Sequence, residues 1–320
     1  MTPSDMRLTK TLRALQLDCL EECVPDGGDQ SHPLGNLISD QHRGIFQIYR
    51  GRPVESTLWR TFGGQVVAQA LTSALRSVHE SFAPQSLHAY FLAPGNPTID
   101  TTYEVEKLRD GRGFCFRSVR AYQDRLDADG QPTGLRRLIF TLQCSFKKPG
   151  DIGPDHGVRP PEVFFAGPES VESDFSRLTP EFVQLLLHEW TDWDIRILPK
   201  QQADVDNLQA WIRYKGPRPD HDFAYFDEMA LAYCSDMTVL QSGFVRAVEA
   251  AEHPEALNVD KASLDHAVWF QRPINVGEWL FLDKRSPTGF GARVFTEGRF
   301  YDAQGNMVAV VTQEGLGRYT

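Results

Sequence analysis

Three polar residues in the last quarter of the chain have the types that hydrolytic sites use, and they stand close together. Residues 262–273 read ASLDHAVWFQRP, with Ser263, Asp265 and His266 at the start of an apolar run. A serine, a histidine and an aspartate form the nucleophilic triad of many hydrolases. Because side chains alternate faces along a strand, Ser263 and Asp265 would share one face, with His266 on the other. The segment therefore predicts no self-contained triad, and we favour a strand histidine bonded to backbone or to a neighbour.

Other familiar chemistries find little support in the sequence. The pattern G-x-S-x-G, which presents the serine of a nucleophile elbow, does not occur. The nine histidines show no HxxxH or HxxH pair and the five cysteines no CxxC spacing, so we predict no metal site and no cofactor. The short G-x-G stretches at 111–113 and 289–291 open no predicted helix, and we interpret them as hairpin turns rather than phosphate loops.

A further acid, Asp236, stands on the apolar stripe of a predicted helix over 226–243. Met229, Tyr233, Asp236 and Leu240 follow helical spacing. A carboxylate that faces an apolar layer is costly unless it is paired or hydrogen-bonded. Because such acids gather at functional sites, a functional role is favoured over a helix residue that turns aside to solvent.

Gln313 places an amide at the end of an otherwise apolar strand face. In MVAVVTQEGL, residues 307–316, alternation puts Gln313 on the same face as Ala309 and Val311. From these residues alone, two interpretations of Gln313 are equally favoured: an amide of a functional site, or a glutamine that hydrogen-bonds to the backbone at a sheet edge. Ser263 is likewise either a hydroxyl of a functional site or simply the first polar residue of its strand. Both lie on strands that are expected to wrap the helix of Asp236.

The elements that must position these residues occur twice in the same order. In each half an apolar strand precedes a long amphipathic helix, and four strands follow. The strand–helix pairs are 43–53 with 62–79, and 208–219 with 226–243, where Gly243 is a predicted stop signal. The following strands are predicted at 86–92, 99–109, 114–123 and 135–146, and at 263–270, 277–284, 292–302 and 307–316. This repetition indicates an internal duplication in which antiparallel strands wrap each helix.

Length and charge limit the organisation and the partners. The 320 residues suffice for two such units. We predict an N-terminal extension over 1–40, a first unit over 41–148, a linker packing across both units over 149–206, and a second unit over 207–320. The net charge of −10, without a Lys/Arg block, argues against a nucleic-acid partner. No apolar run approaches the roughly 20 residues of a membrane span.

Six segments of the sequence resemble, in order, those of the acyl-CoA thioesterase II family, the double hot dog thioesterases of bacteria and eukaryotic peroxisomes. They are FGGQVVAQAL, SLHAYFLAPGNP, YEVEKLRDGRGF, LAYCSDMTVL, SLDHAVWFQRP and TQEGLGR. The resemblance runs from about residue 40 to 318. It implies an α+β fold of two tandem hot dog units, each a long helix wrapped by an antiparallel sheet.

The resemblance also implies an activity and a site. Members hydrolyse acyl-CoA thioesters, here expected to be medium- or long-chain, to free fatty acid and CoA without a cofactor. Their catalytic aspartate, hydroxyl and glutamine correspond to Asp236 in CSDM, Ser263 in ASLDH and Gln313 in TQEG. Bacterial members often carry threonine at the place of Ser263, and the hydroxyl is kept. The family further implies a homo-oligomer in the cytoplasm or the peroxisome, although the final residues, GRYT, are not the S-K-L peroxisomal address.

Two mechanisms are compatible with this set. Asp236 could act as general base on a water held with Ser263 and Gln313, with backbone N–H groups or the Gln313 amide stabilising the oxyanion. Its carboxylate could instead attack directly and form an anhydride. Helix 62–79 contains no acid, and Gln143 stands at the place of Gln313. We therefore expect one active site per chain and a vestigial first unit.

Two other functions are kept as alternatives. Hot dog hydratases and dehydratases pair a histidine with an acid, and no such dyad stands out here. An inactive acyl-CoA-binding relative would not need Asp236, Ser263 and Gln313 together. For His88 a structural role is favoured over substrate contact. The CoA phosphates would need bases nearby, and the candidates, for each of which surface solvation is favoured, are Lys107, Arg109, Arg112 and Arg117.

Overall fold

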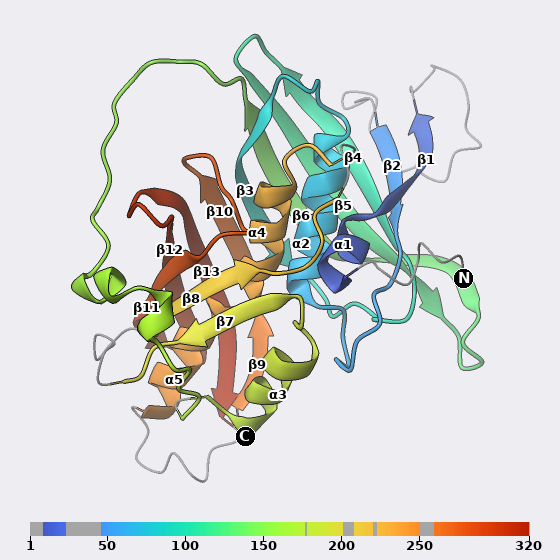
Figure 1. Ribbon diagram of the computed structural model, residues 1–320. Helices are drawn as coiled ribbons and strands as arrows, with labels where there is room; N and C mark the ends of the chain where they lie inside the picture. The colour runs from blue at the N-terminus through green and yellow to red at the C-terminus, as the bar shows by residue number, and fades with distance from the viewer. Residues whose placement is uncertain are drawn as a thin grey trace.

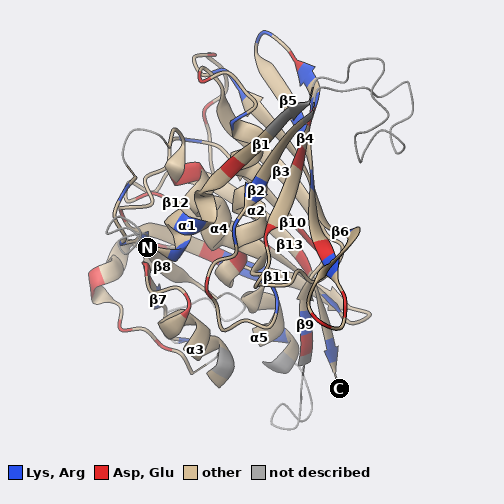
Figure 2. Cartoon of the chain, turned by 90° about the vertical axis from the view of Figure 1, so that its right-hand side faces the viewer, with Lys and Arg blue, Asp and Glu red and all other residues tan. Residues whose placement is uncertain are grey.

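A long antiparallel sheet and two central helices dominate the chain. The computed structural model describes residues 9–23, 46–176, 178–200, 208–219, 223–249 and 259–319. The helices α2 (Gly63–Leu75) and α4 (Phe226–Thr238) lie side by side against one face of the sheet (Figure 1). The view in Figure 2 shows charges of both signs interspersed along the chain.

The sheet has the same strand order in both halves, reflected about its middle. The first half contributes, from the outside inward, β2 (Phe46–Gly51), β4 (Thr101–Asp110), β5 (Phe114–Leu126), β6 (Pro132–Lys147) and β3 (Ala83–Phe91). The second contributes β8 (Ala210–Tyr214), β11 (Leu280–Phe290), β12 (Arg293–Tyr301), β13 (Met307–Tyr319) and β10 (Asp265–Phe270). The two inner strands, β3 and β10, pair and make the sheet continuous. The order strand, helix and four strands is thus present twice, as the repeats predict.

The two central helices are buried on almost all sides because each is enclosed by the sheet and by the other helix. In α2 every residue from Gly64 to Ala74 is buried, and in α4 Asp236 is an exception among largely buried neighbours. Small residues such as Ala68 and Ala232 let the two helices approach closely. Leu12 and Leu15 of α1 (Lys10–Leu15) belong to the same core. The helix faces predicted from apolar spacing are therefore the core faces.

Several predicted boundaries in the second half are wrong; for example, the strand predicted over 277–284 is β11 and extends to Phe290. Two others concern the surroundings of Asp236 and Ser263. Helix α4 ends at Thr238, and α5 (Gln241–Glu249) follows, so Gly243 lies inside a helix and does not stop one. A Cβ at Gly243 would come within 2.8 Å of Val294 on β12, so this glycine permits close packing. The strand predicted over 263–270 is two strands, because β9 (Val259–Ser263) ends before Leu264 and pairs with β13.

The first residues and the linker add elements that the sequence patterns did not predict. β1 (Leu17–Cys23) pairs with β2 at one end of the sheet, and β7 (Trp193–Ile197) pairs with β8 at the other. In the linker, two short 3-10 segments, η2 (Glu162–Ala166) and η3 (Pro168–Ser170), precede the helix α3 (Pro180–His188). Residues 148–159 are exposed throughout and run over the surface as the long green connection of Figure 1.

Candidate active site

The structure brings the three predicted site residues together at the end of α4. Gln313 Nε2 donates to Asp236 Oδ1 at 2.6 Å and to Ser263 Oγ at 3.1 Å. The Ser263 hydroxyl lies 3.5 Å from Asp236 Oδ1, at the limit of a hydrogen bond. A carboxylate only accepts, so the amide must direct its nitrogen toward Asp236. The resulting cluster joins one helix and two strands.

The break between β9 and β10 explains how Ser263 reaches this cluster. β9 pairs with β13 so that Ser263 lies opposite Gly315, two residues from Gln313. The backbone N–H of Leu264 bonds to the Glu314 carbonyl, and Asp265 Oδ1 accepts from the Glu314 N–H at 2.6 Å. Asp265 therefore holds the crossing of the strands in place.

The environment of Asp236 sets its carboxyl to titrate near neutral pH. Burial raises the pKa of Asp236 to about 6, although hydrogen bonds from Gln313 and the Gly64 N–H, the charge of Arg60 and the Ser263 hydroxyl oppose that rise. A carboxyl with such a pKa is a base at pH 7 and can still release the proton that it has taken. Asp236 thus has the electrostatics of a general base.

The start of α2 is a part of the site that the sequence reasoning missed. A Cβ at Gly63 would lie 2.5 Å from Asp236 Oδ2, so the first turn of α2 approaches the carboxylate closely. No side chain caps this turn, and the N–H groups of a first helical turn have no intrahelical acceptors. The adjacent glycines of FGGQ, at the predicted helix start, were the signal for such a close approach.

A cavity of about 490 Å³ opens beside Asp236 and Ser263. Arg60, Asp260 and Lys261 are the charged side chains of its wall apart from Asp236. Its apolar lining comes from both halves and from the linker: Phe62, Val66, Phe91, Ile139, Phe140, Phe182, Leu185, Trp190, Met237, Leu240 and Phe244. Cavities of about 300–1,000 Å³ with few polar groups are typical of small-molecule sites. The arrangement suits a ligand with a long apolar part and a reacting group at the carboxylate.

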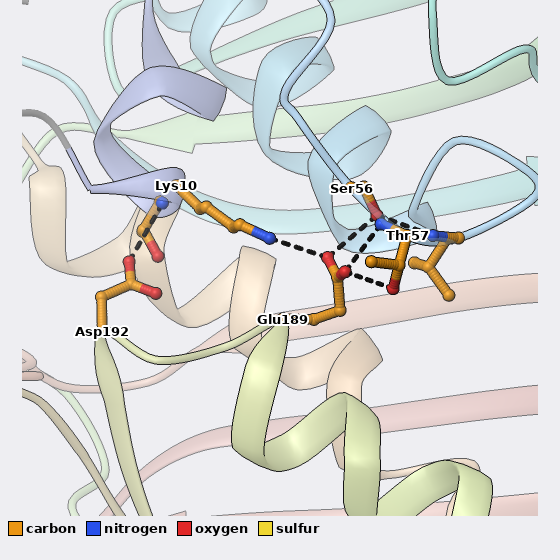
Figure 3. Close-up of polar contacts among 7 residues, drawn as sticks. Lys10, Ser56, Thr57, Glu189 and Asp192 are labelled. Carbon is orange, nitrogen blue, oxygen red and sulfur yellow. Dashed lines mark hydrogen bonds and ion pairs between the residues drawn. The ribbon is translucent and has the colours of Figure 1, made fainter.

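A buried glutamate clamps the wall of this cavity. Glu189, directly after α3, accepts hydrogen bonds from the Thr57 backbone N–H at 2.7 Å, from Ser56 Oγ at 2.9 Å and from Lys10 Nζ at 2.9 Å (Figure 3). Nearby, Asp192 Oδ2 accepts from the Thr11 N–H at 3.0 Å. Burial alone would raise the pKa of Glu189, but these donors lower it to about 2. The clamp ties α1 and the cavity-lining loop after Thr57 to the linker.

The described part of the first half has no equivalent cluster, and the prediction for Gln143 is wrong. Gln143 is exposed and lies opposite His88 on the face of the sheet away from the helices. Alternation makes this difference of one position decisive, because the neighbours Leu142 and Cys144 take the core face. With FGGQ set against FDEM, Thr72 stands where Asp236 would be, and its hydroxyl donates to the Ala68 carbonyl.

Two further expectations can be compared with the structure. Arg117 is 1% exposed, so surface solvation is wrong for this residue, which pairs with Asp110 and bonds Ser77. The imidazole of His88 packs edge-on against Trp269 at a centroid distance of 5.1 Å. Neither side chain lines the cavity.

Two kinds of feature are absent from the described ranges. No cluster of three or more His, Cys, Asp or Glu side chains there could hold a metal ion. No helix among those residues has the length and apolar character needed to cross a membrane.

Both halves of the chain match descriptions of one protein family. Residues 191–316 match the family described as acyl-CoA thioesterase. Residues 55–146 match the acyl-CoA thioesterase N-terminal domain. The two matched segments contain every residue of the Asp236 cluster and the start of α2.

Whole proteins of the same kind are similar along most of the chain. The crystal structure of acyl-CoA thioesterase II TesB2 from Mycobacterium marinum is 32% identical, covers 97% of this chain and 98% of its own, and has a TM-score of 0.72. Acyl-coenzyme A thioesterase 8 of Homo sapiens is 29% identical over 91% of this chain and 93% of its own length. A hot dog protein of unknown function from Alicyclobacillus acidocaldarius, at 18% identity and a TM-score of 0.62, covers 85% and 93% and shares the fold.

Proposed function

This chain belongs to the acyl-CoA thioesterase II family, and on that premise we propose that Asp236 is the general base of its reaction. Its fold is the α+β double hot dog, and its activity is the hydrolysis of acyl-CoA to free fatty acid and CoA. The observation that carries the proposal is the 2.6 Å hydrogen bond by which Gln313 holds a partly buried carboxylate at the cavity.

In the proposed reaction, Asp236 accepts a proton from water as that water attacks the thioester carbonyl carbon. Gln313 engages Oδ1, which leaves Oδ2, beside Gly63, as the oxygen that faces the water. Ser263 accepts from Gln313, so its own hydroxyl hydrogen can orient the water or the carboxylate. Apart from the Gly64 N–H, which bonds Asp236, the uncapped first turn of α2 supplies N–H groups for the developing oxyanion. The C–S bond then breaks, and the proton on Asp236 passes to the departing CoA sulfur.

The test is thiol release from acyl-CoA by Asp236→Asn, with Asp260→Asn as the matched control. Both acids line the same cavity, but Asp260 is exposed and has no part in the cluster. We expect Asp236→Asn to lower kcat by about 100-fold or more, the usual scale of general-base catalysis, and Asp260→Asn to keep it. Thiol release by Asp236→Asn at the wild-type rate would overturn the proposal.

The pH dependence follows from the same carboxyl. Because the base must be ionised and its pKa is raised to about 6, kcat/KM of the wild type should fall as pH drops through about 6. Single-turnover hydrolysis in ¹⁸O-water separates this route from direct attack. Label in the Asp236 carboxyl indicates an anhydride, whereas label in the fatty acid alone supports the water route.

The proposal also covers the length of the acyl chain, the oligomeric state and the cellular compartment. The aliphatic and aromatic lining of the cavity supports a medium- or long-chain acyl group, which a chain-length series of acyl-CoAs would test. Large exposed side chains on the sheet, such as Tyr90 and Leu135, both 61% exposed, support a homo-oligomer that sedimentation would reveal. A similar yeast protein is named peroxisomal acyl-coenzyme A thioester hydrolase 1, which supports the peroxisome beside the cytoplasm as the compartment.

A further inference from the structure

Behind the site, a buried histidine lies next to Gln313. His266 is fully buried on β10, and its Nε2 lies 2.8 Å from Ser235 Oγ on α4. β10 and β13 pair so that Ala267 lies opposite Thr312, and the next step of this register sets His266 opposite Gln313. Alternation places both on the helix side of the sheet, so the imidazole and the amide are neighbours.

Two polar atoms of these neighbours are left over. Among the described residues, His266 Nδ1 and Gln313 Oε1 are buried and have no hydrogen-bond partner. The amide orientation is fixed, because Gln313 Nε2 must face the Asp236 carboxylate. Orphaned buried polar atoms are rare and cost about 1–3 kcal/mol each. A single hydrogen bond between these two atoms would satisfy both.

Whether His266 Nδ1 and Gln313 Oε1 can form a hydrogen bond depends on which ring nitrogen carries the hydrogen. Burial lowers the pKa of His266 to about 4, and the Gln313 side chain opposes that shift, so the ring is neutral at pH 7 and carries one N–H. With the hydrogen on Nε2, two acceptors would face each other at Nδ1 and Oε1. With the hydrogen on Nδ1, it can reach Gln313 Oε1, and Nε2 can accept from the Ser235 hydroxyl at 2.8 Å. The Ser235 hydroxyl then turns its one hydrogen to Nε2 and away from the Ala232 carbonyl, which lies 2.9 Å from the same oxygen.

We propose that His266 is a positioning residue that donates from Nδ1 to Gln313 Oε1 and so locks the Gln313 amide toward Asp236. The hydrogen bonds then run in one direction, from the Ser235 hydroxyl through His266 and Gln313 to the Asp236 carboxylate and the Ser263 oxygen. This inference rests on the proposed function, since it concerns how the same site is held. His266 touches no reacting atom.

The lock matters because a glutamine amide has two nearly isosteric orientations. If the amide turned over, its oxygen would face the Asp236 carboxylate and the attacking water would lose a fixed base. Asp236 would also lose a hydrogen bond that holds its pKa down. Loss of the lock should therefore lower kcat and move the acidic limb of the rate profile to higher pH, with little change in KM.

Two substitutions separate positioning from packing. In His266→Asn the amide nitrogen stands near the place of Nδ1 and can still donate to Gln313. In His266→Gln the amide stands near the place of Nε2 and meets Ser235 instead. The side chain of Asn is smaller than that of Gln, so His266→Asn leaves the larger cavity. If the role of His266 were purely structural, His266→Asn would therefore be both the less stable and the less active variant.

We expect the opposite order for catalysis. His266→Gln should lower kcat by at least about tenfold relative to His266→Asn, and its acidic limb should lie at higher pH than that of the wild type. The melting temperature of His266→Asn should be equal to or lower than that of His266→Gln. If kcat follows the melting temperatures instead, or if the acidic limb stays in place in both variants, the proposal is wrong.

The tautomer offers a direct readout that does not depend on activity. In ¹⁵N-histidine-labelled protein, the signal that disappears in both His266 variants should report a neutral ring with its hydrogen on Nδ1. A hydrogen on Nε2 would overturn the inference. This outcome is distinguishable from failure of the proposed function, which would show as thiol release by Asp236→Asn whatever the tautomer of His266.

Discussion

At the scale of single residues, the site depends on a carboxylate that is held in an unfavourable place. Asp236 projects from a buried helix, and its desolvation is only partly offset by Gln313, the Gly64 N–H and Arg60. Such a balance makes the group reactive because the carboxyl is mostly ionised at pH 7, yet its pKa of about 6 is close enough for it to take up a proton during the reaction. Small changes in what touches the carboxylate should therefore have large effects on the rate.

The two glycines at the start of α2 give the sharpest prediction at this scale. A Cβ at Gly63 would meet Asp236 Oδ2 at 2.5 Å, whereas a Cβ at Gly64 would meet the Tyr233 backbone oxygen at 2.2 Å. Gly63→Ala should lower kcat by about tenfold or more while its stability changes by no more than about 1 kcal/mol. Gly64→Ala must push α2 away from α4, so it should clearly lower the melting temperature as well.

Thiol-release kinetics and thermal unfolding of both variants make the comparison. Two results would contradict it: a Gly63→Ala enzyme with unchanged kcat, or one that is destabilised as much as Gly64→Ala. The first would mean that the start of α2 does not constrain Asp236, and the second that both glycines serve helix packing alone.

At the scale of elements, sequence patterns predicted the helix faces, which show as a periodic spacing of apolar residues. They missed the features that depend on contacts between distant elements. The spacing of Met229, Tyr233 and Asp236 placed the acid correctly, because a buried helix face is visible as a 3.6-residue repeat. The face of Gln143 was wrong by one position, since similarity of local letters does not fix strand register. Gly243 was misread because close packing against Val294 depends on an element 51 residues away along the sequence.

The elements outside the repeats were missed for another reason. β1 and β7 are short and pair with the ends of a sheet that already exists, and the short helix α1 packs on α2 and the core. Elements of this length carry little periodicity of their own. The clamp at Glu189 was equally invisible, because its donors come from Lys10 and from Ser56 and Thr57, all more than 130 positions away in the sequence.

The clamp leads to a prediction about the wall of the cavity. Glu189→Gln keeps the shape but loses the charge and one of two accepting oxygens, so it should lower stability by about 1–3 kcal/mol at pH 7 and raise KM. The carboxyl has its pKa lowered from 4.5 to about 2 in the folded protein. Its stabilisation is therefore complete above pH 4.5 and is lost as pH falls toward 2.

Thermal unfolding at pH 7 and at pH 3 tests the clamp. The deficit of Glu189→Gln should be smaller at the lower pH, where the wild type has lost part of its advantage. Glu169→Gln is the control, because Glu169 is 79% exposed in its pair with Arg196 and should change stability by no more than about 0.5 kcal/mol at either pH. A deficit that is equal at both pH values would show that the Glu189 charge does not contribute.

At the scale of the whole molecule, the site belongs to neither half alone. Asp236, Ser263 and Gln313 come from the second half, but the helix start beside the carboxylate and much of the cavity wall come from the first. The β3–β10 pair and the contact of α2 with α4 join the halves. The exposed stretch over 148–159 adds a covalent link but no core contact.

Cleavage of that stretch should leave the enzyme working. A protease site inserted between Gly150 and Asp155 and then cut should give two fragments that co-elute and keep activity within about twofold of the uncut chain. The cut should cost only exposed ion pairs of this stretch, such as that between Asp155 and Arg272, which contribute little to stability. Size-exclusion chromatography and thiol release measure the result, with the uncut insertion variant as control. Separation of the fragments would contradict the prediction.

The reflected strand order has a consequence for how such a protein can change. Two identical units that associate must accept every substitution twice, so a residue that suits one position in the pair is imposed on the other. When both units share one polypeptide, that constraint disappears. Here the helix starts have diverged into Gly63–Gly64 on one side and Asp227–Glu228 on the other, and the acid at Asp236 has Thr72 as its counterpart. One unit can thus carry the chemistry while the other supplies the wall against which it works.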